Sequence, residues 1–283
     1  MIYFATLFFK RYGKIRLLKG VKTMKYSICC RDDINSKMIK EKIHASLNEN
    51  GWIFDEVNPD IIISVGGDGT YLRAFHQYIE QIDHVKFIGI HTGKLGFFCE
   101  FTRNEVDDLI NSLLHEEPKI IEHNLLDLTY KDVHYYGINE VRIENPYNTM
   151  ICNVYVHDEL LENFRGNGLN FASTTGASAY NRSLGGPLLD PNIETIIMGE
   201  VASINHNAYR SLNSFLVLNK GNVIRLQGNF KRCLIGYDHL FTNINDSSID
   251  DEVMVTLSNK TMKTLHYKDV SYIYRLRKAF VAD

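Results

Sequence analysis

The fold of this 283-residue chain is decided by the stretch Ile61-Ile62-Ile63-Ser64-Val65-Gly66-Gly67-Asp68-Gly69-Thr70. Its first five residues form a largely β-branched apolar run, typical of a strand buried on both faces of a parallel sheet. The next five combine three glycines with one carboxylate, and Thr70 can cap a helix over 71–82. This order places the loop at the carboxyl end of a strand, where α/β sheets bind ligands.

The loop 66–70 is typical of phosphate chemistry, because glycines without Cβ atoms let phosphate oxygens approach the backbone. A carboxylate beside a phosphate repels it unless a cation intervenes or the acid moves a proton. Asp68 is therefore interpreted as a general base or a metal-side group. The alternative is a tight turn with Asp68 as a turn former, but the strand–loop–helix context favours function. The spacing matches neither a Walker loop nor G-x-G-x-x-G.

Helical and strand patterns alternate around this stretch, from 24 to 122. Strands are expected over 25–30 and 85–90, and helices over 36–50 and 106–114. This alternation predicts an α/β domain with a parallel sheet.

Short strand candidates dominate from 123 to 265, which predicts a β-rich second domain. They lie at 125–130, 135–143, 151–156, 215–218, 223–226, 233–237 and 253–257. Residues 272–281 are mildly helical, and we expect the segment 266–283 to return to the α/β domain.

The composition is that of a globular protein, with 45% hydrophobic and 23% charged residues. A net charge of −3 gives no reason to expect nucleic acid, and no apolar run reaches the roughly 18 residues of a membrane helix. The five cysteines include no C-x-x-C pair, so neither a disulfide framework nor a zinc site is expected. We predict reduced thiols and a cytoplasmic location.

Residues 1–23 differ from the rest, because an apolar start is followed by six basic residues with no acid. A secretory signal has the opposite order. The remaining chain has 25 basic against 34 acidic residues. The segment is interpreted either as a membrane-touching or anion-binding arm or as an upstream extension foreign to the natural protein. The second is favoured, because Lys19-Gly20-Val21-Lys22 before Met24 could be encoded by a purine-rich sequence similar to a bacterial ribosome-binding site.

Two further signals lie in the second half. The stretch 165–191 is rich in glycine and small hydroxyl residues, which suits a flat ring or sugar lying against backbone, with Tyr180 as a stacking face. Its alternative is a long loop between strands. Asn139-Glu140 pairs an amide with a carboxylate that could grip ribose hydroxyls, although such a pair alone is more often a solvated strand end.

Taken together, these segments resemble NAD kinases of the short bacterial form. Residues 66–70, Asn139-Glu140, 165–186 and Asp238-His239 follow in that family's order and at its separations, and 91–97 looks like its second substrate loop. The resemblance implies an α/β domain joined to a β-rich domain, a cleft between them, and a homotetramer. It also implies transfer of the γ-phosphate of ATP, or of polyphosphate, to the adenosine-ribose 2′-hydroxyl of NAD, assisted by Mg or Mn.

By this resemblance, Asp68 is the base that takes the 2′-hydroxyl proton, and Gly69 shapes the loop beside it. Asn139 and Glu140 bind ribose hydroxyls or the diphosphate-proximal part of the dinucleotide. Phe97 belongs to the second substrate loop. No protein ligand for the metal is expected.

The remaining carried-over residues surround the dinucleotide. Arg165 and Asn167 approach from a neighbouring subunit or domain, and Ala202 gives backbone contacts. His239 lines a pocket, with a structural histidine as its alternative. The nucleoside pockets are lined by Ser178, Ala179, Tyr180, Asn181, Arg182 and Ser183, with Tyr180 against a ring.

Two departures from the family pattern keep alternatives open. Asn167 stands in a Gly-Asn-Gly sequence where the family usually has Gly-Asp-Gly, and Ser173-Thr174-Thr175 replaces Ser-Thr-Pro. The runner-up enzyme is a diacylglycerol-type lipid kinase, which shares the loop at 66–70 but leaves Asn139-Glu140 unexplained. The third hypothesis is a non-catalytic dinucleotide-binding module, against which the intact Asp68 argues.

Overall fold

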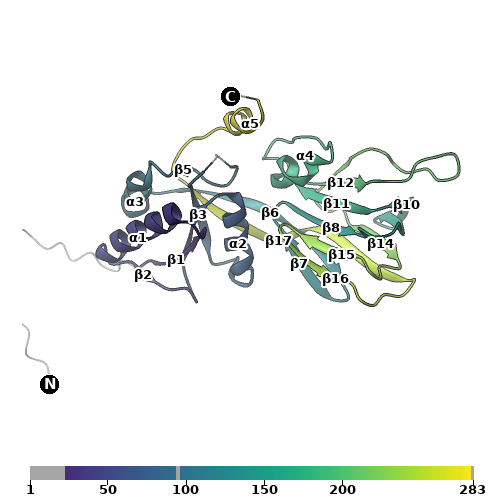
Figure 1. Cartoon of the computed structure of the whole chain (residues 1–283), viewed down its shortest axis with the longest axis horizontal. Helices are drawn as coiled ribbons and strands as arrows, with labels where there is room; N and C mark the ends of the chain where they lie inside the picture. Colours follow the sequence, from purple (N-terminus) through teal and green to yellow (C-terminus); the bar gives the residue numbers. More distant parts are fainter. Residues whose placement is uncertain (1–22, 94–95, 282–283) are drawn as a thin grey trace, which may run out of the picture.

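The computed structural model describes residues 23–93 and 96–281 (Figure 1). Of the extension predicted over 1–23, only residue 23 is among the described residues. The limits predicted for the domains, 24–122, 123–265 and 266–283, stay predictions.

The first region is an α/β sheet with helices on its faces (Figure 1). Its strands β2, β1, β3, β4 and β5 are neighbours in that order and pair in parallel. The β-branched strand β3 is buried at every residue, as expected for the centre of a covered parallel sheet. The strands are β1 (Lys25–Cys30), β2 (Ile53–Phe54), β3 (Ile61–Gly66), β4 (Lys86–His91) and β5 (Phe101–Thr102); the helices are α1 (Ile34–Glu49), α2 (Asp68–Gln77), the short η1 (Ile79–Gln81) and α3 (Val106–His115).

This sheet does not end with the parallel strands. The long strand β17 (Asp251–His266) pairs in parallel with β4 and antiparallel with β6 (Lys119–Tyr130) and β14 (Ile224–Gly228). Through β14 it continues to β9 (Met150–Val156) and β10 (Glu159–Gly166), while β7 (Val133–Gly137) pairs with β6. In the described part of the chain the sheet has 11 strands and is mixed. The predicted parallel sheet is therefore one section of a larger sheet.

A second, antiparallel sheet completes the β-rich region. Among the described residues it has six strands, in the order β13-β12-β11-β8-β15-β16. A large apolar cluster, including Phe164, Phe171 and Phe230, lies between the two sheets. The bounds are β8 (Glu140–Glu144), β11 (Gly168–Ser173), β12 (Thr195–Val201), β13 (Leu216–Asn219), β15 (Leu234–Tyr237) and β16 (Leu240–Asn243), with η2 (Thr175–Ser178) and α4 (Tyr180–Ser183) after β11. The predicted two-part architecture, α/β followed by β-rich, is confirmed.

The last helix, α5 (Tyr272–Phe280), lies above both regions in Figure 1. Ser271 caps it, since its hydroxyl accepts a hydrogen bond from the Tyr274 N–H. The buried Arg275 guanidinium donates to the carbonyls of Cys99, at 2.7 Å, and Gly96, at 3.3 Å. No helix in the described ranges is long and apolar enough to cross a membrane.

Candidate active site

Asp68 begins α2 directly after β3, and the loop that follows β4 holds its carboxylate. Oδ2 accepts a 2.8 Å hydrogen bond from the Phe97 N–H, and Oδ1 accepts a 3.3 Å bond from that of Phe98. At Gly96 a Cβ would come within 2.1 Å of Oδ1, so the loop needs a glycine there. Gly69, next in the helix, is exposed. Because each carboxylate oxygen keeps a further lone pair, Asp68 is oriented by backbone and still able to accept a proton.

Asn139 and Glu140 lie where β8 begins, and a buried carboxylate fixes their backbone. The N–H groups of Ile138, Asn139 and Glu140 donate to Asp238 at 3.0, 2.8 and 3.2 Å. His76 Nε2, in the last turn of α2, lies 2.9 Å from the same carboxylate. Asp238 therefore connects the helix that begins at Asp68 to the strand that carries Asn139 and Glu140.

The carboxyl group of Glu140 is buried but still has hydrogen-bonding capacity for a ligand. Burial, with the nearby Asp238 carboxylate, raises the pKa of Glu140 to about 8, although Arg142 opposes this. Its Oε2 atom is buried and has no hydrogen-bond partner among the described residues. A neutral carboxylic acid both donates and accepts, which suits a sugar hydroxyl.

His239 follows Asp238 and is exposed. Its ring centroid is 5.3 Å from that of His76. Partial burial, together with His76, lowers the pKa of His239. The side chain is therefore not enclosed as a structural histidine would be, and its predicted pocket-lining role stays a prediction.

The segment 178–183 lies after β11 and forms the end of η2 and the short helix α4. The Tyr180 hydroxyl donates to Glu144 at 3.2 Å, and the Arg142 guanidinium lies 5.4 Å from the Tyr180 ring centroid. Asn181 is fully buried, and its amide donates to the carbonyls of Ala177 and Pro187 at 3.2 and 3.0 Å. Asn181 thus organises the loop, whereas Ser178, Ala179 and Tyr180 are partly exposed, and Arg182 and Ser183 are exposed.

Helix α5 brings the Asp68 loop and α4 together. The Phe97 ring lies 5.7 Å from that of Phe280, and the Arg182 guanidinium lies 3.9 Å from the Phe280 ring centroid. Phe97 belongs to the first region and Arg182 to the second. Phe97, whose backbone holds Asp68, and Arg182 of α4 are therefore both in contact with the Phe280 side chain.

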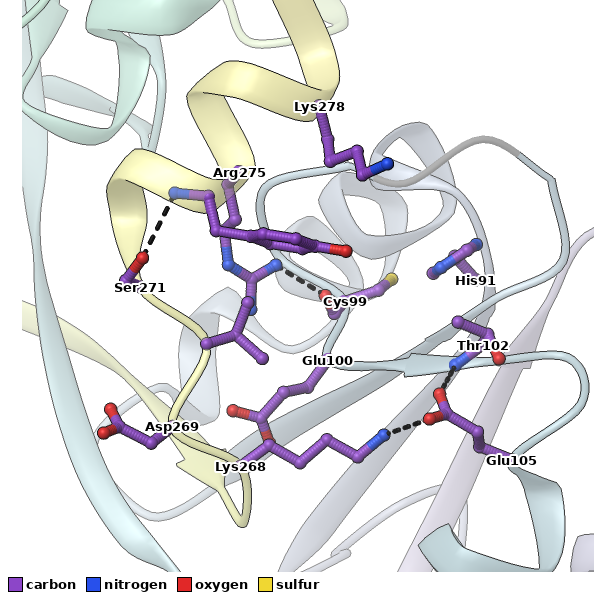
Figure 2. A pocket seen from close by; sticks show the side chains of 12 residues that line it. His91, Cys99, Glu100, Thr102, Glu105, Lys268, Asp269, Ser271, Arg275 and Lys278 are labelled. Carbon is purple, nitrogen blue, oxygen red and sulfur yellow. Dashed lines mark hydrogen bonds and ion pairs between the residues drawn. The ribbon is translucent and has the colours of Figure 1, made fainter. Parts of the chain in front are cut away.

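A cavity of about 660 Å³ lies between α5 and the carboxyl end of β4 (Figure 2). His91 lines it, and its Nδ1 lies 3.0 Å from the Gly93 carbonyl, so Nδ1 carries a hydrogen. His91 Nε2 is buried with no partner among the described residues. Arg275 and Lys278 line the same cavity from α5.

Arg165, Asn167 and Ala202 form a separate group where β10 meets β11. The Arg165 guanidinium lies 4.0 Å from the Tyr209 ring centroid. Asn167 donates from its amide to the Asn145 carbonyl at 3.1 Å, and Ala202 has a left-handed φ of +47°. None of these contacts involves Asp68, so within one chain the structure does not bring this group to the proposed base.

Two family models match the chain: the ATP-NAD kinase N-terminal domain over residues 22–118 and the ATP-NAD kinase C-terminal domain over 138–267. The chain belongs to the NAD kinase family. The predicted family is confirmed, and so is the predicted NAD kinase function. Both halves are matched, including the segments that a lipid kinase leaves unexplained.

Members of the NAD kinase family resemble this chain over nearly its whole length. It is 37% identical to the NAD kinase of Leuconostoc citreum over 265 residues, covering 92% of this chain and 99% of that protein. It is 36% identical to NAD kinase 1 of Listeria monocytogenes serovar 1/2a over 267 residues, covering 92% and 100%.

Two solved kinases share the fold. A yeast NADH kinase complexed with NADH has a TM-score of 0.77 at 18% identity, covering 92% of this chain and 89% of that one. An NAD kinase from Archaeoglobus fulgidus in complex with ATP has a TM-score of 0.71 at 19% identity, covering 90% and 99%.

Asn167, which departs from the NAD kinase pattern, donates a hydrogen bond that the family's usual aspartate could not donate. An aspartate there could not donate to the Asn145 carbonyl, and its charge would face that oxygen. We expect Asn167→Asp to lower the free energy of unfolding by about 1 kcal/mol. Because the contact is remote from the reacting hydroxyl, the NAD KM should change by no more than about tenfold and kcat little. Urea unfolding and steady-state kinetics test this, and activity gained in an otherwise inactive protein would contradict the enzyme assignment.

Near Arg165, two carboxyl groups share one donor. Glu162 Oε2 and Glu200 Oε1 both accept from the Leu212 N–H, at 3.0 and 3.1 Å. Burial, with the neighbouring Glu200, raises the pKa of Glu162 to about 7. The Glu162–Glu200 pair therefore holds a proton at a pH where exposed glutamates are ionised.

This pair predicts a pH-dependent stability. A folded-state pKa of about 7 lies above the unfolded value, so the stabilising proton is lost as the pH rises from about 4.5 through about 7. We expect the melting temperature to fall over that interval and Glu162→Gln to flatten the fall. Thermal melts of both proteins between pH 5 and 8 measure this, with exposed Glu159→Gln as control. Parallel curves for Glu162→Gln and the unaltered protein would contradict the shared proton.

Several residues that organise the site were not predicted. His76, Arg142, Glu144 and Arg275 belong to no motif in the sequence, and the partners His76 and Asp238 are 162 positions apart. Asp238 was part of the motif with His239, but nothing in the sequence indicated that it binds three backbone N–H groups.

Proposed function

We propose that this chain phosphorylates the 2′-hydroxyl of the adenosine ribose of NAD with the γ-phosphoryl group of ATP, giving NADP and ADP. The observation that carries the proposal is the Asp68 carboxylate, oriented by two backbone N–H groups at the carboxyl end of β3. Asp68 accepts the 2′-hydroxyl proton while the new O–P bond forms and the bond to ADP breaks. Such a base is worth about 10²–10⁴-fold in rate.

The dinucleotide is bound by the second region. Asn139 and Glu140 hydrogen-bond ribose hydroxyls, which is supported by the Glu140 Oε2 atom, for which the described part of the chain offers no hydrogen-bond partner. Ser178, Tyr180 and Ser183 line the nucleoside pockets. Arg165, Asn167 and Ala202 complete a neighbouring subunit's site in a homotetramer, which is consistent with their separation from Asp68 in one chain. Light scattering after gel filtration tests the tetramer.

A divalent metal, Mg or Mn, enters with the ATP phosphates as part of that substrate. The described residues contain no group of three or more His, Cys, Asp and Glu side chains able to hold a metal by themselves, so the phosphates would provide most of its ligands. When bound, such an ion neutralises charge that develops on the transferred phosphoryl group. Polyphosphate as an alternative donor and a cytoplasmic location are part of the same proposal.

The direct test incubates the purified chain with ATP, Mg²⁺ and NAD, and measures NADPH after an NADP-specific dehydrogenase. Parallel reactions replace ATP by polyphosphate, Mg²⁺ by Mn²⁺, and NAD by NADH or diacylglycerol. Formation of NADP that requires both nucleotides is the expected result. Phosphorylation of diacylglycerol without NADP formation would overturn the proposal.

A further inference from the structure

Helix α5 buries an arginine and exposes an isoleucine, the reverse of the usual arrangement. Arg275 has 6% of its surface exposed, and among the described residues it is the one buried residue of the helix. Ile273, two positions earlier, is 70% exposed. Arginine is almost never fully buried unless its charge has a partner. The burial of Arg275 therefore indicates a role beyond the packing of α5.

The hydrogen bonds of Arg275 go to the backbone of the loop that holds the proposed base. Its Nη1 atom donates to the Cys99 carbonyl at 2.7 Å, as Figure 2 shows, and to the Gly96 carbonyl at 3.3 Å. The two residues between these carbonyls, 97 and 98, hold the Asp68 carboxylate through their N–H groups. Arg275 therefore binds the same segment, 96–99, that orients Asp68.

One peptide unit connects Arg275 to Asp68. The Gly96 carbonyl and the Phe97 N–H belong to the same trans peptide, in which C=O and N–H point in opposite directions. The guanidinium binds the oxygen at 3.3 Å, and the Asp68 carboxylate binds the N–H at 2.8 Å. The peptide unit lies between a cation and an anion, so the two hydrogen bonds strengthen each other. Rotation of this peptide unit would break both bonds.

The charge of Arg275 is close enough to Asp68 to interact with it. Burial lowers the pKa of Arg275, and the carboxylates of Glu100 and Asp68 are among the groups that oppose this shift. Arginine stays protonated in proteins, so the guanidinium carries its charge. The Glu100 carboxylate is engaged elsewhere, 2.7 Å from His266 Nδ1 and 2.8 Å from the Tyr267 N–H. Asp68 is the carboxylate that the backbone connects to Arg275.

Two rings of α5 hold the side chain of Phe97 as well. The ring centroids of Tyr272 and Phe280 lie 6.4 and 5.7 Å from that of Phe97. Tyr272 is the first residue of α5 and Phe280 the last, so Arg275 lies between them. The last helix of the chain therefore holds both the backbone and the ring of a residue that binds Asp68.

We propose that Arg275 is a positioning residue for phosphoryl transfer, which holds the peptide unit of Gly96 and Phe97 in the orientation that aims Asp68 at the 2′-hydroxyl. This role rests on the proposed function, because it requires that Asp68 is the base. Arg275 acts through the backbone and not by contact with a substrate. A displacement of about 1 Å at a reacting group can lower the rate by about 10²-fold, so the effect belongs to kcat.

The test measures steady-state NADP formation by the unaltered chain, Arg275→Met, Arg275→Lys and Arg277→Met. Methionine keeps an unbranched side chain without charge or donors, and lysine keeps the charge and some donors. Arg277→Met is the matched control, because Arg277 is exposed on the same helix. Arg275→Met is also combined with Asp68→Asn. All assays are run below the temperature at which any of these proteins begins to unfold.

We expect Arg275→Met to lower kcat by about 10- to 100-fold and to change the KM for NAD and for ATP by less than about threefold. Arg275→Lys should lose less, because its ammonium group still donates to a carbonyl. Arg277→Met should stay within about twofold of the unaltered chain. In the Asp68→Asn background, Arg275→Met should lower kcat by less than about threefold, because no base is left to position.

Hydrogen–deuterium exchange gives a readout that does not depend on activity. In Arg275→Met the amides of residues 97 and 98 should exchange at least about tenfold faster than in the unaltered chain. Arg277→Met should leave their exchange unchanged. Unchanged exchange of these amides in Arg275→Met would overturn the proposal, whether or not the chain makes NADP.

The kinetics can overturn the proposal in three ways. These are an unchanged kcat in Arg275→Met, a loss confined to KM, and an equal loss of kcat with and without Asp68→Asn. If Arg275→Met does not fold, Arg275→Lys decides by the same criteria. Near-normal turnover by Asp68→Asn alone would instead remove the base from the proposed function, so the two failures are distinguishable.

Discussion

Replacing Asp68 with asparagine is expected to lower kcat by about 10²–10⁴-fold while the dissociation constant for NAD changes little. The amide cannot take the proton of the 2′-hydroxyl, which is a poor nucleophile until a base accepts that proton. The amide oxygen can still accept from the Phe97 N–H, but its NH₂ group would face the Phe98 N–H. A stability loss of about 1 kcal/mol should therefore accompany the loss of activity.

NADP formation measures the first effect, and calorimetric titration with NAD measures the second. Asp107→Asn is the matched control, because Asp107 lies in the first turn of α3 and is exposed. It should leave both quantities unchanged. Turnover by Asp68→Asn within about threefold of the unaltered chain would mean that Asp68 is not the base.

Asp238→Ala is expected to lower the free energy of unfolding by about 3–5 kcal/mol. The substitution leaves three buried N–H groups and His76 without their acceptor. It also places alanine at a left-handed φ of +51°, which aspartate and asparagine tolerate better. NAD affinity should fall as well, because Asp238 fixes the backbone of Asn139 and Glu140.

Urea unfolding measures this loss. Asp238→Asn, which keeps one acceptor oxygen and tolerates the backbone conformation, should lose less than the alanine variant. Asp246→Ala, at an exposed position, is the control and should change stability by less than about 0.5 kcal/mol. Equal stability of Asp238→Ala and the unaltered chain would show that the contacts of Asp238 are dispensable.

The parts of this molecule that could be predicted are those encoded locally. The buried run before Asp68 and the glycines around it specify a strand, a loop and a helix within about ten residues, and the structure has all three. The order of an α/β part followed by a β-rich part was also predictable from the sequence, because each short strand of the second part has its own turn signals.

The parts that were not predicted depend on contacts between distant segments. Strand β17 pairs in parallel with β4, which lies far from it in the sequence, and antiparallel with β6. These pairings join a parallel and an antiparallel section into one sheet. The periodicity of a single strand does not show which distant strand it pairs with. The amide of Asn181 donates to the Ala177 and Pro187 carbonyls, a role in the loop after η2 that the sequence did not indicate, while its assignment to a nucleoside pocket stays a prediction. The raised pKa of Glu162 needs Glu200 beside it, and nothing in the sequence pairs them.

The central position of β17 also affects how the chain is made. Lys263 and Thr264 pair with Lys86 and Phe87 of β4, a partner synthesised long before them. Until residue 266 has left the ribosome, β4 presents an open edge, and exposed edges pair readily with other chains. We therefore expect the nascent chain to depend on chaperones and to fold slowly, since contacts of such long sequence separation form late. Truncation before β17 should yield an aggregating fragment instead of an independently folded α/β half.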